Sequence, residues 1–300
     1  MKPAQRAPGD RAKAGPLQKC RAGRRCWTAL PDGGHYPFQL RARKAEVLLL
    51  VGRWMELEEQ YRLDLEKAEA AGLRQHQAVL LMERGELQGW RNEHGQAAAS
   101  LERAARIYGE LGDAPGRLRC ENGLAVVSIN VREYDKAEAL ITSSTGQARR
   151  LGLKNALCSS LNSHAVLCRE RKQIGRAIAY LEERMAVSQE MGSFSDVASS
   201  HMNIAVLLTE NGQYAMALRH NETALELSHK SGDIVQQEFA LYNQAQILRK
   251  LGRGEECLDC LQKALAVSRH LGDEPIMQCA VNDIARVKQA LVDNSRIEEL

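Results

Sequence analysis

The chain has 300 residues, of which 44% are apolar, 26% charged and only 4% aromatic. This balance is ordinary for a globular protein, and the abundance of Ala, Leu, Glu, Arg and Gln favours helices over sheets. The longest apolar run, residues 47–51, is far shorter than the roughly 20 residues that span a bilayer. We therefore expect an all-α chain without a membrane span.

The net charge of +3 combines two segments of opposite sign. Residues 1–38 carry eight Lys or Arg and two acidic residues, a net charge of +6, whereas residues 39–300 carry 33 basic and 36 acidic residues, a net charge of −3. The mildly acidic part offers no basic surface for nucleic acid. We expect no nucleic-acid partner, with the basic tail as a weak exception.

Residues 1–38 form the first predicted segment. They contain five prolines, scattered basic residues and no helical period, which indicates a disordered tail. The alternative is a nucleic-acid arm or an organelle-targeting peptide, but the segment lacks an amphipathic helix and interleaved aromatic residues. Cys20 and Cys26 have no second cysteine pair beside them, so we expect no zinc site there.

Glycine recurs every 40 residues in the rest of the chain, at Gly72, Gly112, Gly152, Gly192, Gly232 and Gly272. Such a period is typical of a repeat protein, in which each unit packs only against its neighbours. A second column lies 20 residues away and consists of Gly52, Asn92, Arg132, Lys172, Gly212 and Gly252. Each unit therefore divides into two helices joined by a tight turn.

Three further columns hold small residues, which are needed where two helices approach closely. The column on the first helix of each unit is Ala45, Gly85, Ala125, Ala165, Ala205, Ala245 and Ala285. The columns on the second helix are Ala97, Ala137, Ala177, Ala217 and Cys257, and then Ala104, Ser144, Ala224 and Ala264. The departures from these columns are Leu57, Asp64 and Arg184.

The ends of the predicted helices have their own pattern. A bulky apolar residue begins most second helices and is expected to fill the space between the helices, as in Trp54, Tyr134, Ile174 and Tyr214; only His94 and Gly254 break this column. At three unit boundaries an Asp follows the glycine and is expected to cap the next helix, as in Asp113, Asp233 and Asp273. Trp90 and Tyr242 are interpreted as further wedges between helices.

These residues resemble the tetratricopeptide repeat family. The matching motif is Asn203-Ile204-Ala205, Asn211-Gly212-Gln213-Tyr214, Ala217 and Ala224-Leu225. The 40-residue spacing looks like the long-helix variety found in kinesin light chains, cell-polarity adaptors and bacterial signalling proteins. The resemblance covers residues 39–291 and implies a right-handed α-solenoid of about six helical hairpins, with a closing helix at Pro275–Leu291 and a frayed C-terminal tail at 292–300.

Catalytic and metal-binding motifs are not recognisable in the chain. It has no phosphate-binding loop, nucleophile elbow or zinc-protease motif, so we expect no enzyme, cofactor or metal. Cys257 and Cys260 form a C-x-x-C pair, but Cys257 stands in a column of alanines, which favours packing. The cysteines in helical patterns follow no apolar signal segment, so we interpret them as reduced thiols of a cytoplasmic protein.

The first helix of each hairpin lines the inner, concave face of the superhelix in the resembled family. Five asparagines fall in two columns there, namely Asn122, Asn162 and Asn282 in one and Asn203 and Asn243 in the next. An amide both donates and accepts, so a ladder of amides can hold a peptide backbone. Arg169, Glu210 and Arg249 add charges along the same helices. The alternative is that these asparagines bond neighbouring helices.

These features predict a scaffold or adaptor that binds a peptide segment of a protein partner in the concave groove. The solenoid ends would expose apolar faces, which allows self-association. The alternative function is that of a regulatory or sensory module in a larger bacterial signalling protein, such as a kinase, cyclase or ATPase, which acts in cis through a change of curvature.

Overall fold

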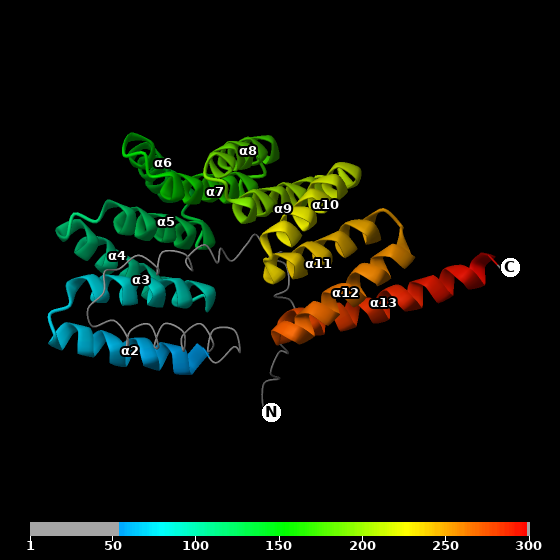
Figure 1. The fold of residues 1–300 in the computed structure, drawn as a ribbon, viewed down its shortest axis with the longest axis horizontal. Coiled ribbons are helices and arrows are strands. Elements are labelled where there is room, and N and C mark those ends of the chain that lie inside the picture. Colours follow the sequence, from blue (N-terminus) through cyan, green and yellow to red (C-terminus); the bar gives the residue numbers. More distant parts are fainter. Residues whose placement is uncertain (1–53, 299–300) are drawn as a thin grey trace, which may run out of the picture. The chain divides into compact units, whose positions relative to one another are not determined.

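A computed structural model describes the backbone of residues 54–298 and the side chains of residues 54–293. The predicted tail at 1–38 and the first helix of the first hairpin lie outside the described residues. The described part contains helices and no strand (Figure 1), namely α2 Trp54–Ala70, α3 Arg74–Trp90, α4 His94–Glu110, α5 Ala114–Asn130, α6 Tyr134–Arg150, α7 Lys154–Glu170, α8 Ile174–Glu190, α9 Phe194–Glu210, α10 Tyr214–Ser231, α11 Ile234–Lys250, α12 Gly254–Leu271 and α13 Glu274–Glu298.

Each helix packs against the next one along the chain. Five complete hairpins follow one another within the described residues, α3–α4, α5–α6, α7–α8, α9–α10 and α11–α12, with α2 before them and α13 after them. First helices of neighbouring hairpins also touch, as in α3 with α5, α5 with α7 and α9 with α11. This stacking is that of an α-solenoid, as the 40-residue period predicts.

The glycine columns mark the turns between helices. All six glycines at the unit boundaries have φ between +64° and +68°, a left-handed conformation that glycine adopts without steric cost. The mid-unit column has the same conformation even where glycine is missing, with φ of 61° at Asn92, 65° at Arg132 and 61° at Lys172. The turn geometry is thus set by the repeat, and three hairpins accept a strained residue to keep it.

The three predicted aspartate caps are present. Oδ1 of Asp113 accepts the N–H of Gly116 at 2.9 Å, and Oδ1 of Asp233 accepts that of Gln236 at 3.1 Å. Asp273 caps α13 in the same way through Ile276, at 3.2 Å. Each carboxylate satisfies a helix N–H that has no partner within the helix.

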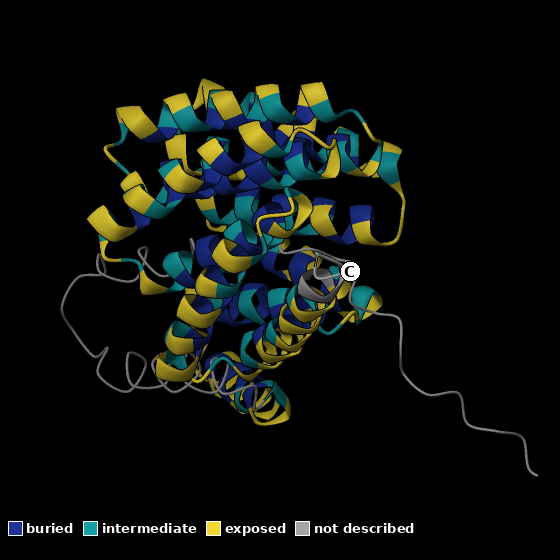
Figure 2. Ribbon diagram, turned by 90° about the vertical axis from the view of Figure 1, so that its right-hand side faces the viewer, coloured by how far each residue is buried: buried dark blue, intermediate teal, exposed yellow. Residues whose placement is uncertain are grey.

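The small-residue columns lie between the helices, where Figure 2 shows buried residues facing inward and exposed ones outward. Ala125, Ala205 and Ala245 are fully buried, as are Ala97, Ala137, Ala177 and Ala217. A Cβ placed on Gly85 would lie 2.8 Å from Cγ of Leu101, so this position requires glycine. Ala285 is exposed, because no described helix packs on that side of α13. The departures Leu57, Asp64 and Arg184 are also buried.

The ends of the array differ from the sequence-based boundaries in one respect. The closing helix was expected to end at Leu291, with a frayed tail at 292–300, but α13 continues to Glu298. The sequence Val292-Asp293-Asn294-Ser295 contains no glycine or proline, so no helix-stopping residue follows Leu291. Among the described residues, no helix is long and apolar enough to cross a membrane.

Candidate functional site

The candidate site is the first-helix face, by which we mean the surface formed by α3, α5, α7, α9, α11 and α13 where neighbouring first helices meet. Polar side chains on this face are linked from one unit to the next. The two residues of most of these hydrogen-bonded pairs are separated in sequence by close to 40 residues, because the bonds join similar positions of neighbouring units. The face is therefore pre-ordered by contacts between helices.

Asn162 and Asn203 form one of these links. Nδ2 of Asn203 on α9 donates to Oδ1 of Asn162 on α7 at 3.1 Å. Asn203 is 1% exposed, whereas Asn162 is only half-buried. Asn203 therefore holds two hairpins together, and Asn162 keeps part of its amide towards solvent.

Asn122 also lies between helices. Its side chain is 6% exposed, and Nδ2 donates to Oγ of Ser160 on α7 at 3.1 Å. Ser160 in turn lies 3.0 Å from Oγ of Ser144 on α6. This chain of polar groups fixes the boundary between the α5–α6 and α7–α8 hairpins. Asn122 and Asn203 thus have the helix-bonding role that the sequence left as an alternative, and little of either amide is accessible to a partner.

Asn243 and Asn282 remain accessible. Asn243 on α11 is half-buried, and Asn282 on α13 is exposed and accepts a hydrogen bond from Gln278 at 3.1 Å. The structure does not bring the five asparagines into one continuous ladder. Of the five, Asn162, Asn243 and Asn282 have surface to offer to a ligand.

Of the three predicted charged residues, Arg169 and Glu210 bind each other, whereas Arg249 is exposed. Nε of Arg169 donates to both carboxylate oxygens of Glu210, at 2.8 and 3.0 Å. These hydrogen bonds raise the pKa of the Arg169 guanidinium. The two charges neutralise each other across the α7–α9 boundary. Arg249 is exposed, and its Nη2 donates to Oε1 of Gln246 at 2.7 Å.

Two polar groups on this face were missed by the sequence analysis. Arg119 on α5 makes a two-pronged contact with Glu86 on α3, at 3.0 and 3.1 Å. On α13, Oδ2 of Asp283 accepts from the Tyr242 hydroxyl at 2.9 Å and from Gln246 at 2.8 Å. Burial and the bond to Asp283 raise the pKa of Tyr242. The available signal for Tyr242 and Asp283 was their separation of 41 residues, about one repeat, whereas Arg119 and Glu86 lie 33 residues apart and gave no such signal.

Most of the cysteines and several of the histidines in the described residues are buried or half-buried and contact neighbouring side chains. His164 stacks on Tyr180 with ring centroids 4.5 Å apart, and Nδ1 of His201 lies 3.0 Å from Nδ1 of His220. Burial lowers the pKa of all three histidines. Burial raises the pKa of the Cys260 thiol to about 11, so this thiol is a poor nucleophile at neutral pH. No group of three metal-ligating side chains occurs in the described residues.

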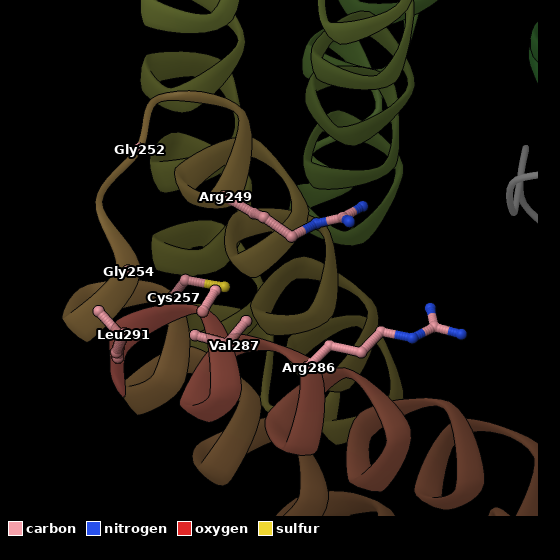
Figure 3. A pocket seen from close by; sticks show the side chains of 8 residues that line it. Arg249, Gly252, Gly254, Cys257, Arg286, Val287 and Leu291 are labelled. Carbon is pink, nitrogen blue, oxygen red and sulfur yellow. The ribbon is translucent and has the colours of Figure 1, made fainter. Parts of the chain in front are cut away.

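A cavity of about 320 Å³ opens at the junction of α11, α12 and α13 (Figure 3). Its lining combines apolar groups with two arginines and consists of Arg249, Gly252, Gly254, Cys257, Arg286, Val287, Ala290 and Leu291. Arg249 belongs to the first-helix face, so the cavity adjoins the candidate site.

Comparisons with known proteins agree with the observed fold. The sequence model described as "Tetratricopeptide repeat" matches residues 240–270. A Rap protein complexed with Competence and Sporulation Factor has a TM-score of 0.60 and 13% identity, with 83% of this chain and 74% of that chain covered. NprR in complex with its cognate peptide NprX has a TM-score of 0.57 and 14% identity, with coverages of 90% and 80%.

A third similar structure is a signal transduction ATPase with numerous domains from Pyrococcus horikoshii, which carries a tetratricopeptide repeat sensor. The TM-score is 0.63 and the identity 11%, with 88% of this chain and 41% of that chain covered. At these identities the likeness shows the fold alone, a right-handed α-solenoid of tetratricopeptide type, as the sequence predicts. A search of curated proteins finds no significant match.

Proposed function

We propose that this chain, which has the fold of a tetratricopeptide repeat solenoid and matches the tetratricopeptide repeat model at residues 240–270, is a non-catalytic interaction module that binds a peptide segment of a partner protein. The segment lies along the first-helix face, which acts as the groove. Bound peptides in similar solenoids support this proposal, because the NprR structure contains its cognate peptide NprX.

The single observation that carries the proposal is the ordered polar surface of the first helices. The link between Asn203 and Asn162, at 3.1 Å, holds the Asn162 amide in place while leaving it half-buried. Binding to an amide that is already held in place costs less conformational entropy than binding to a mobile side chain, which must be ordered when the peptide binds. Two repeat units further along the chain, Asn243 offers a second accessible amide on α11.

An affinity pull-down tests this proposal. Asn162→Ala/Asn243→Ala removes the two accessible amides, and we expect captured partners to be lost or strongly reduced. Each truncation costs about 0.5–1.5 kcal/mol of binding free energy. The matched control is Gln189→Ala/Gln262→Ala, which removes exposed amides from the second helices of the same two hairpins. Equal retention of partners by both double variants contradicts the proposal.

A second function is favoured by one observation. The ATPase with a tetratricopeptide repeat sensor aligns with 88% of this chain but only 41% of its own length. A regulatory or sensory module acting in cis on an attached effector domain would give such a relationship. The neighbouring coding sequence distinguishes the two functions, because an in-frame kinase, cyclase or ATPase domain supports the regulatory one.

A further inference from the structure

Two histidines of one hairpin lie in contact. His201 of α9 and His220 of α10 are 19 residues apart in sequence, and their Nδ1 atoms lie 3.0 Å apart. The ring centroids are 5.1 Å apart, and both residues are half-buried. A separation of 19 residues is not that of a metal-binding motif, so only the fold brings these two imidazoles together.

The repeat shows that packing does not require histidine at either position. Because the units recur every 40 residues, the residues equivalent to His201 and His220 are known for the other hairpins. In three of the four other complete hairpins the first position is a buried leucine, namely Leu81, Leu161 or Leu241. The second position in the other hairpins is Ser100, Leu140, Tyr180 or Cys260.

Among the complete hairpins that the structure describes, α9–α10 is thus the one with an imidazole at both positions. A leucine in such a place contributes its whole side chain to apolar packing, whereas an imidazole needs partners for its ring nitrogens. The repeat fold therefore does not account for the pair. What distinguishes two adjacent imidazoles from leucine is the chemistry of their nitrogen atoms.

The separation of the two nitrogens is the one that a shared metal ion needs. A metal ion binds an imidazole nitrogen at about 2.0–2.1 Å, so two nitrogens on one ion lie roughly 2.9 Å apart at a right angle and roughly 3.4 Å apart at a tetrahedral angle. The observed 3.0 Å falls within this range. By a turn of the two rings, an ion can replace the proton that the Nδ1 atoms share, with little change in their separation.

The surroundings favour the neutral imidazoles that bind metals. Burial lowers the pKa of His201 and of His220, so both rings are neutral at pH 7. Glu182 of α8 raises the His220 pKa and Arg219 of α10 lowers it. The Glu182 carboxylate is exposed and offsets part of the charge of a bound ion. Because the described residues contain no group of three ligating side chains, water completes the coordination shell.

We propose that His201 and His220 bind one divalent transition-metal ion, which links α9 to α10. Imidazole and water ligands suit Ni²⁺, Cu²⁺ and Zn²⁺, whereas Mg²⁺ prefers oxygen ligands. The ion binds the folded chain, in which the two rings are together, and so stabilises the hairpin that carries Asn203. This site is independent of the peptide-binding function proposed above.

A nickel titration of the untagged full chain tests this inference. Calorimetry at about pH 7.5 should show one Ni²⁺ site per chain that depends on the histidine pair, and saturating Ni²⁺ should raise the urea midpoint. Mg²⁺ should do neither. At about pH 5 both effects of Ni²⁺ should be lost, because protons compete for the imidazoles.

Matched variants locate the ion on the chain. Loss of an outer-shell partner already weakens metal sites 10–100-fold, so His201→Gln and His220→Gln should each weaken Ni²⁺ binding at least about tenfold. The control His229→Gln/His270→Gln removes two exposed imidazoles from α10 and α12 and should bind Ni²⁺ as the wild type does. Every variant keeps all cysteines, so any nickel bound by thiols is the same in each. A circular dichroism spectrum like that of the wild type shows that each variant is folded.

The site is distinguished from a plain hydrogen bond between two helices by the nickel response. A hydrogen bond alone predicts no rise of the urea midpoint with Ni²⁺, and this result overturns the site. A rise that His201→Gln/His220→Gln retains overturns it as well, as does a rise that His229→Gln/His270→Gln loses. A rise that only the His201 and His220 variants lose supports it.

Discussion

Arg184 of α8 places a buried charge in a column of small residues, and its removal tests how the α8–α9 boundary is held. The side chain is 2% exposed. Nη1 donates to the backbone O of Asp196 at 3.0 Å and to Oγ of Ser200 at 2.5 Å, and Nη2 lies 3.3 Å from Oδ1 of Asp196. Other units have small residues here, namely Ala104, Ser144, Ala224 and Ala264.

The expected cost of Arg184→Ala follows from these contacts. Two buried methylenes are worth about 1.6 kcal/mol, and each of the two Nη1 hydrogen bonds about 1.5 kcal/mol. About 2 kcal/mol is regained, because a buried charge is removed and because Nε–H of Arg184 has no partner among the described residues. Ser200 and Asp196 keep other bonds, including one between them at 3.0 Å. The unfolding free energy should fall by roughly 2–3 kcal/mol.

Urea unfolding followed by circular dichroism measures this change. Arg184→Met keeps an apolar stem without the charge, and should cost less than about 1 kcal/mol. Arg176→Ala, at an exposed position on the same helix, should stay within about 0.5 kcal/mol of the wild type. If Arg184→Ala is as stable as the wild type or more stable, the small-residue column governs this boundary and the hydrogen-bond reasoning is wrong.

Three further predictions concern turns, pH and thiols. Gly232→Val should lower the unfolding free energy by about 1 kcal/mol or more, because Gly232 has φ +67°. The control Gly175→Ala in α8 should be neutral or stabilising. Thermal melts measure both changes. The pKa of His201 and of His220 is lowered by burial, so folding favours their neutral forms and the unfolding free energy should fall as pH drops from about 7 towards 5. Glu182 raises and Arg219 lowers the His220 pKa, and His201→Gln/His220→Gln should flatten the pH dependence of urea midpoints. Among the described cysteines, exposed Cys279 should be alkylated first, and Cys120, whose pKa burial raises to about 12, only on unfolding, as peptide mass spectrometry will show.

The repeat architecture was predictable because it depends on backbone geometry that the sequence displays directly. A left-handed turn favours glycine, so a glycine every 40 residues marks every unit boundary. The alanine columns were equally predictable, because a close contact between two helices excludes larger side chains. The end of the closing helix was not predictable, because no glycine or proline follows Leu291 to mark where α13 stops.

The candidate site was predictable only in part. Column positions identified the helices that carry Asn162 and Asn203, but not that one amide is buried and the other half-exposed. The two asparagines stand in adjacent columns, and burial also varies within one column, from 6% exposure at Asn122 to half-buried Asn162, so the period does not specify it. Gly254 was recognisable as a gap in a column of bulky residues. Its consequence was hidden, because Leu291 and Arg286 come from a different helix.

Site-specific photo-crosslinking tests the central claim, peptide binding on the first-helix face, most directly. Benzoylphenylalanine at Val206 of α9 stands on the same helical face as Asn203 and Glu210, and the same probe at Glu226 of α10 reports on a second helix. The account predicts that a captured partner crosslinks to position 206 and not to position 226. Crosslinks from position 226 with none from position 206 would contradict it.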